Sequence, residues 1–145
     1  MGSPVFVGFQ RILVAFDATP HAQHALEVAL SMAADMKAKL FVFAVIRPPK
    51  PAKNLEFNAV LEDGRERYES RFVPIRERAR WKGIDLETEV VLGHPAKQIV
   101  HRAESIEASL IVMGRRRHTI FHRWVLGSNS DCILKHAHCP VMIVH

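Results

Sequence analysis

Five short segments of the chain are rich in aliphatic, β-branched and aromatic residues. They are Arg11–Phe16 (RILVAF), Lys39–Ile46 (KLFVFAVI), Leu86–Leu92 (LETEVVL), Ser109–Met113 (SLIVM) and Pro140–His145 (PVMIVH). Polar or turn-forming residues bound these segments, as is typical of β-strands. Most of them are apolar at consecutive positions rather than at every second position. This pattern indicates strands that are covered on both faces.

The segments between these strands have apolar residues at helical spacing. Thr19 can cap a first helix that has Pro20 at its first position. A second helix is predicted from Asn58 to about Trp81, with a kink at Pro74. The first helix buries a face of small residues, namely Ala22, Ala25, Leu26, Ala29 and Ala33.

Two shorter helices are predicted in the second half of the chain. One begins at Pro95, and the other runs from Ser128 to Ala137. The buried face of the first comprises Ile99, Ala103 and Ile106, and that of the second comprises Cys132, Ile133, Leu134 and Ala137.

Strands apolar on both faces that alternate with helices require a parallel sheet with helices on each side. The sequence therefore predicts one doubly wound α/β domain at residues 11–145, with a five-stranded parallel sheet. Right-handed crossovers favour the strand order 3-2-1-4-5. Ligands of such sheets bind in the crevice at the carboxyl ends of the first and fourth strands. Asp17 and Gly114 follow or end those strands and are candidate site residues.

Composition excludes several classes of protein. With 48% hydrophobic and 24% charged residues, the chain is an ordinary globular protein rather than a disordered one. No apolar run approaches the roughly 20 residues that span a membrane. Residues 1–10 form an N-terminal extension without the features of a signal peptide, and the opening Met-Gly-Ser resembles a cloning remnant. Two cysteines form no disulfide framework, so we predict a cytoplasmic protein. The net charge of +5 favours anionic partners.

The basic stretch from Val112 to Asp131 (VMGRRRHTIFHRWVLGSNSD) has the features of a phosphate site at its ends. Free N–H groups at a helix start bind anions, and Gly127–Ser128 stands at such a start. A plain helix cap is the alternative. Gly114 permits either close backbone approach or a positive φ.

Several motifs together resemble a universal stress protein domain from about Arg11 to His145. They are ILVAFD, VLGHPAKQIV, IVMG followed by a Gly-Ser pair, and HAHCPVMIV. Nucleotide-binding members of this family carry Gly-x-x-Gly, nine residues, and then Gly-Ser or Gly-Thr. Gly114 matches the first glycine and Gly127–Ser128 match the last pair, but Arg117 replaces the middle glycine.

The resemblance implies a stress-related regulatory protein that binds an adenine nucleotide, ATP or AMP, with or without Mg²⁺. The resemblance also implies that Asp17 contacts the adenine or the ribose. The resemblance places Ala15 and Val45 beside the base, and Gly114, Gly127, Ser128, Asn129 and Ser130 around the phosphates. The chemistry of the guanidinium group adds Arg116 and Arg117 as candidate phosphate contacts. The expected mechanism is a dimeric switch in which the ligand orders the loop from Gly114 to Ser128.

Arg117 leaves two interpretations open. Its side chain can block the approach of a phosphate, or its guanidinium, with those of Arg115 and Arg116, can hold one. If it blocks, the protein is a family member that binds no nucleotide and acts through dimerisation and protein interaction.

The remaining groups of residues predict no metal site and no catalytic site. The segment His136–Cys139 lacks a fourth zinc ligand apart from Cys132, so no metal site is predicted. No catalytic residue identifies itself, although the resemblance leaves slow ATP hydrolysis open. Nucleic acid is an unfavoured partner, since aromatic residues do not cluster near the arginines, apart from Phe121 and Trp124. The last strand, Val141 to Val144, is an apolar edge, and both its pattern and the resemblance predict a homodimer through it.

Overall fold

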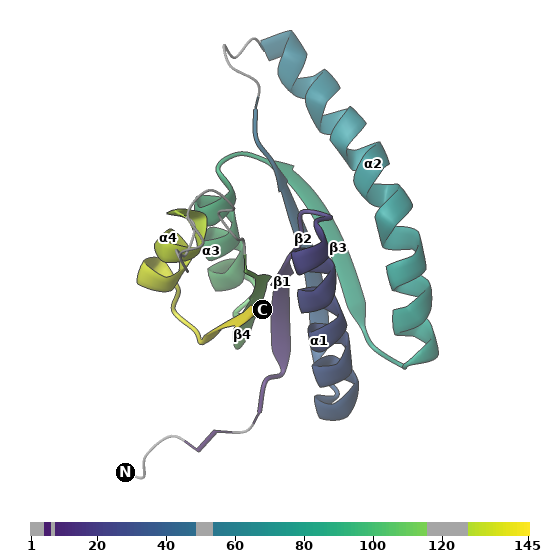
Figure 1. The fold of residues 1–145 in the computed structure, drawn as a ribbon, viewed down its shortest axis with the longest axis vertical. Coiled ribbons are helices and arrows are strands. Elements are labelled where there is room, and N and C mark those ends of the chain that lie inside the picture. Colours follow the sequence, from purple (N-terminus) through teal and green to yellow (C-terminus); the bar gives the residue numbers. More distant parts are fainter. Residues whose placement is uncertain (1–4, 7, 49–53, 116–127) are drawn as a thin grey trace.

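The computed structural model describes residues 5, 6, 8–48, 54–115 and 128–145 as a five-stranded parallel sheet flanked by helices (Figure 1). The strands have the order β3-β2-β1-β4-β5, as predicted. None of the helices within the described ranges is long and apolar enough to cross a membrane. The elements are β1 (Arg11–Ala15), α1 (Pro20–Met36), β2 (Lys39–Ile46), α2 (Asn54–Trp81), β3 (Leu86–Leu92), α3 (Pro95–Ser105), β4 (Leu110–Gly114), α4 (Ser128–His136) and β5 (Val141–Val144).

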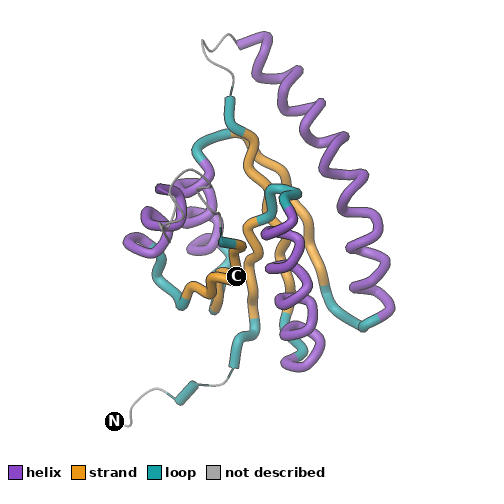
Figure 2. The backbone as a smooth tube through the Cα atoms, in the orientation of Figure 1, coloured by secondary structure: helices purple, strands orange, loops and turns teal. Residues whose placement is uncertain are grey.

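The helices form a layer on each face of the sheet (Figure 2). Helices α1 and α2 bury their apolar residues against one face, where Val14 and Val42 are at most 1% exposed. Helices α3 and α4 cover the other face, where Leu13 and Ile111 are fully buried. Neighbouring residues of one strand therefore enter opposite cores, which explains why the strands are apolar at consecutive positions.

The first helix begins as its sequence predicts. The Thr19 hydroxyl accepts a hydrogen bond from the Ala22 backbone N–H at 3.2 Å, and Pro20 is the first helical residue. All five residues of the predicted small-residue face are at most 4% exposed. Small side chains allow α1 to lie close to the sheet, so its first turn reaches the carboxyl ends of β1 and β4.

Two predictions about the other helices need correction. Helix α2 begins four residues earlier than predicted, and Pro74 lies inside it. Leu134 is 41% exposed, whereas its neighbour Ile133 is fully buried. Consecutive residues of a helix point about 100° apart, and in α4 it is Ile133 that faces the core while Leu134 lies toward the surface. The other members of that set, Cys132 and Ala137, are partly buried against the core.

An ion pair joins the two helices on the first face. The Arg78 guanidinium of α2 donates hydrogen bonds to both carboxylate oxygens of Glu27 in α1. These bonds hold the pKa of Glu27 below its usual value, and they raise the pKa of Arg78. The pair fixes α2 alongside α1, and residues of the preceding turns of α2 thereby reach the upper end of the sheet.

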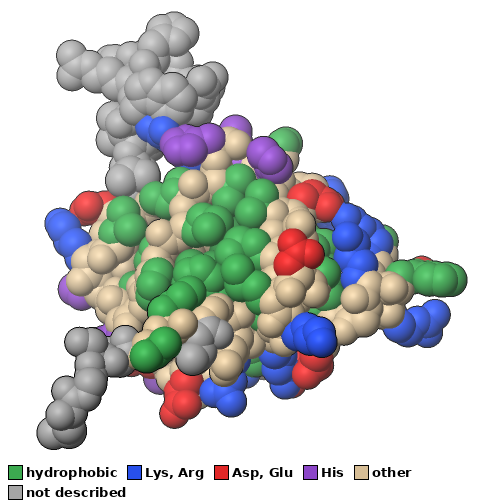
Figure 3. All heavy atoms as spheres, turned by 90° about the horizontal axis from the view of Figure 1, so that it is seen from below, with side chains coloured by type: hydrophobic (Ala, Val, Ile, Leu, Met, Phe, Trp, Pro, Cys, Tyr) green, Lys and Arg blue, Asp and Glu red, His purple; other side chains and the backbone are tan. Residues whose placement is uncertain are grey.

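Some hydrophobic side chains remain partly exposed at the surface. Figure 3 shows the molecule from below, relative to the view in Figure 1. Hydrophobic side chains gather at the centre of this face, and charged side chains surround them (Figure 3). Strand β5 is an edge of the sheet, and its four apolar residues are all only partly buried. An apolar edge of this kind is suited to pairing with another chain.

Candidate functional site

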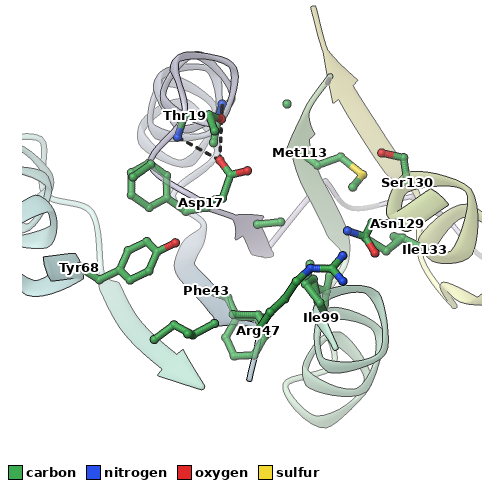
Figure 4. A pocket seen from close by; sticks show the side chains of 18 of the residues that line it. Asp17, Thr19, Phe43, Arg47, Tyr68, Ile99, Met113, Asn129, Ser130 and Ile133 are labelled. Carbon is green, nitrogen blue, oxygen red and sulfur yellow. Dashed lines mark hydrogen bonds between the residues drawn. The ribbon is translucent and has the colours of Figure 1, made fainter. Parts of the chain in front are cut away.

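A cavity of about 880 Å³ opens at the carboxyl ends of β1, β2 and β4, between α1, α2, α3 and α4 (Figure 4). This is the switch point of the sheet, where the topology predicts a ligand. Apolar side chains of Phe43, Ile99, Met113 and Ile133 contribute to its walls. Six of the ten predicted site residues line it, namely Ala15, Asp17, Val45, Gly114, Asn129 and Ser130.

The other four predicted residues are not placed in the cavity. Arg116, Arg117 and Gly127 lie outside the described residues, as does the side chain of Ser128, the first residue of α4. Most of the loop predicted to order on ligand binding is outside the described residues too.

Arg115, the first arginine of the basic run, turns toward the end of the chain. Its backbone N–H donates to the Val144 carbonyl at 2.9 Å, and its guanidinium lies 3.0 Å from Nδ1 of His145. It does not belong to the cavity wall. The hypothesis that Arg115 contacts phosphate therefore lacks support from its position.

Asp17 organises the turn between β1 and α1. Its Oδ1 accepts hydrogen bonds from the Thr19 backbone N–H at 3.0 Å and from the Thr19 hydroxyl at 2.6 Å. Ala18 between them has a φ of 63°, which is unusual for a residue with a side chain. Asp17 thus forms the turn and also lines the cavity.

Gly114 ends β4 directly against the first turn of α1. A Cβ atom at this position would lie 2.4 Å from the carbonyl oxygen of His21 and 2.8 Å from the backbone nitrogen of Ala22. Of the two roles considered for this glycine, close backbone approach is the one observed, and the approaching backbone is a helix of the same chain. A side chain at this position would force β4 and α1 apart.

The start of α4 supplies polar groups to the cavity. Asn129 and Ser130 lie in its first turn, where backbone N–H groups lack partners within the helix. Ser130 is 7% exposed, and it is the only buried polar residue in the described ranges. Together with the positive end of the helix dipole, these groups suit an anion such as phosphate.

Helix α2 and the end of β2 contribute a basic wall that the sequence reasoning missed. Arg47, which follows β2, and Arg67, Tyr68 and Arg71 of α2 line the cavity. Figure 4 shows Arg47 and Tyr68. The signal for the residues of α2 was their helical spacing, because positions 67, 68 and 71 share one side of a helix. Tyr68 is also the only tyrosine of the chain.

The segment His136–Cys139 takes a structural role. His138 Nε2 lies 2.5 Å from a carboxylate oxygen of Glu104, and burial raises the pKa of the Cys139 thiol. Across the described part of the chain, no three His, Cys, Asp or Glu residues are arranged to hold a metal ion.

Sequence comparison identifies relatives along nearly the whole chain. Residues 8–145 match the sequence profile of the universal stress protein family. A universal stress protein of Thermus aquaticus is 32% identical over 138 residues, which cover 94% of this chain and 98% of that protein. One of Methanocaldococcus jannaschii is 29% identical over 143 residues, covering 94% and 82% of the two chains.

Solved structures of universal stress proteins share the fold. A family member from Burkholderia pseudomallei is 30% identical with a TM-score of 0.71, covering 97% of this chain and 98% of its own. Three more distant ones, at 19–24% identity and TM-scores of 0.62–0.65, cover at least 93% of this chain and 90% of theirs. Their structures hold cAMP, AMP (Arabidopsis thaliana) and dAMP (Archaeoglobus fulgidus).

Proposed function

The chain belongs to the universal stress protein family, and we propose that it binds an adenine nucleotide, ATP or AMP, in the cavity at its switch point. The observation that carries this proposal is the convergence of Asp17, Gly114 and the α4 N-terminus on one cavity. Relatives of the same fold that hold cAMP, AMP and dAMP support it. The apolar side chains that line the cavity would contact the base, and the N-terminus of α4 would bind the phosphate.

Titration calorimetry with ATP, AMP and cAMP tests this proposal. The parent protein is expected to bind at least one of these nucleotides, and Ser128→Ala is expected to weaken binding about tenfold through loss of one hydrogen bond to phosphate. Arg117→Gly restores the middle glycine of the family motif, and an increase in affinity would show that Arg117 blocks phosphate.

Ser105→Ala is the matched control, because Ser105 is an exposed serine at the last turn of α3 and does not line the cavity. If no nucleotide gives heat with the parent protein or with Arg117→Gly, the proposal fails. The protein would then be a family member that acts through dimerisation and protein interaction without a nucleotide.

We further propose that the protein is a homodimeric switch joined through β5. An edge strand of four apolar, partly buried residues supports this proposal. Two copies of β5 can pair antiparallel across a two-fold axis and close the assembly. Nucleotide binding at the neighbouring carboxyl ends of the strands would bias the interaction with protein partners.

The variant Ile143→Lys is expected to convert the dimer to a monomer, because it places a charge in the centre of the apolar edge. Sedimentation velocity measures the change. Val91→Lys is the matched control, since Val91 lies on β3 at the opposite edge and is also partly buried against the same core. Thermal unfolding of both variants checks that they fold. A dimer that persists in Ile143→Lys refutes this interface.

A further inference from the structure

Polar and charged groups lie on two opposite sides of the cavity. Tyr68 on α2 lies across the cavity from Asn129 and Ser130 at the start of α4 (Figure 4). The α2 side carries Arg67 and Arg71, which we call the arginine wall. Arg47, which follows β2, points toward Asn129 instead (Figure 4). A phosphate bound at the start of α4 would leave the arginine wall, a second cationic region of the same cavity, unused.

The arginine wall has little anionic compensation in the described part of the protein. Nε of Arg67 lies 3.4 Å from a carboxylate oxygen of Asp63, but both side chains are about 70% exposed. Exposed pairs of this kind contribute little. No ion pair of Arg71 is formed among the described residues. Asp17, the one acidic residue that lines the cavity, accepts two hydrogen bonds from Thr19.

Tyr68 gives the arginine wall a rigid support. Its ring stacks on Phe72 with centroids 5.9 Å apart and meets the edge of Phe16 at 6.3 Å. Phe16 and Phe72 are at most 2% exposed, so the aromatic cluster anchors this part of α2 to the core. Arg67 and Arg71 lie four residues apart, one helical turn, beside this anchored ring. Their Cα positions are thereby held at the cavity.

We propose that the arginine wall binds a second phosphate group of the nucleotide, separate from the 5′-phosphate at the start of α4. The ligand class is an adenosine phosphorylated both at O5′ and at a second ribose oxygen, such as adenosine 3′,5′-bisphosphate. Guanidinium groups bind phosphate through paired hydrogen bonds, which suits them to this role. The volume of about 880 Å³ lies near the upper end of the range of ~300–1,000 Å³ for small-molecule sites. This inference rests on the proposed nucleotide site.

Calorimetric titration with AMP and with adenosine 3′,5′-bisphosphate tests the arginine wall. The parent protein is expected to bind the bisphosphate at least tenfold more tightly than AMP. The double variant Arg67→Gln/Arg71→Gln is expected to reduce this ratio to about one while it leaves the AMP affinity within threefold. Arg65→Gln/Arg80→Gln is the matched control, because both are exposed arginines of α2 that do not line the cavity. This control is expected to keep the full ratio.

The outcomes separate the two proposals. If AMP binds and the bisphosphate binds no more tightly, the arginine wall is refuted while the nucleotide site stands. If neither ligand binds, the nucleotide site fails and the inference fails with it. If Arg67→Gln/Arg71→Gln still binds the bisphosphate at least tenfold more tightly than AMP, the inference is also overturned. An ATP titration provides a further arm: if the double variant weakens ATP as much as the bisphosphate, the wall holds a polyphosphate tail and the ribose-phosphate assignment is wrong.

Discussion

Replacing Gly114 with alanine is expected to lower the free energy of unfolding by about 3 kcal/mol, the upper end of the usual cost of overpacking. The new Cβ would lie 2.4 Å from the carbonyl oxygen and 2.5 Å from the carbonyl carbon of His21. These are backbone atoms in the first turn of α1, so no side-chain rotation can relieve the contact. The end of β4 must move away from α1, which opens a junction where Val112 and Ala22 are buried. Thermal unfolding would show a decrease in Tm of roughly 10 °C.

Gly64→Ala is the matched control for this prediction. A Cβ at Gly64 in α2 would meet the Ile46 side chain, whose Cδ1 lies 1.9 Å from the ideal position. Because that atom ends a flexible side chain, a change of rotamer can make room. Alanine is also favoured over glycine inside a helix by about 1 kcal/mol. The net change should therefore be small. If Gly114→Ala is as stable as the parent protein, close packing against α1 is not the reason for the glycine.

Much of the fold follows from the sequence because apolar runs and helix caps are local signals. β2 and β3 match the predicted ranges residue for residue, and Thr19 with Pro20 places the start of α1. Periodicity is weaker where a helix is short. In α4 the apolar pair Ile133 and Leu134 suggests two buried residues, but only the packing of α4 against α3 and the sheet selects Ile133.

Some residues of the candidate site could be predicted from the sequence and others could not. Residues that end β1 and β4 could be predicted, because strand order alone brings Asp17 and Gly114 to one crevice. The contribution of α2 could not. Arg67 and Arg71 belong to a helix in which many residues are charged. Charged residues of a helix usually face solvent, so the sequence does not distinguish these two from the other arginines. Which of its arginines faces the cavity depends on how α2 is rotated, and buried Phe72 and the Arg78–Glu27 pair set that rotation.

Asp17 holds the turn before α1 through a relay of hydrogen bonds. Its Oδ1 accepts from the N–H and the hydroxyl of Thr19, and the Thr19 oxygen accepts from the Ala22 N–H. The intervening Ala18 has a φ of 63°, a conformation that costs roughly 1–2 kcal/mol for a residue with a Cβ. The relay compensates for this strain. A carboxylate is not required for it, since an amide oxygen can accept the same two hydrogen bonds.

Asp17→Asn is therefore expected to separate the ligand-binding role from the role in the turn. The asparagine keeps the acceptor for Thr19, so Tm should stay within a few degrees of the parent value. A hydrogen bond between a carboxylate and the nucleotide contributes about 1.5–3 kcal/mol, so affinity should decrease by roughly tenfold to a hundredfold. Asp17→Ala should lose the same affinity and about 1 kcal/mol of stability besides, because the Thr19 donors lose their acceptor. Calorimetry and thermal unfolding on both variants measure the two effects independently. Full nucleotide affinity in Asp17→Asn would mean that Asp17 serves the turn alone.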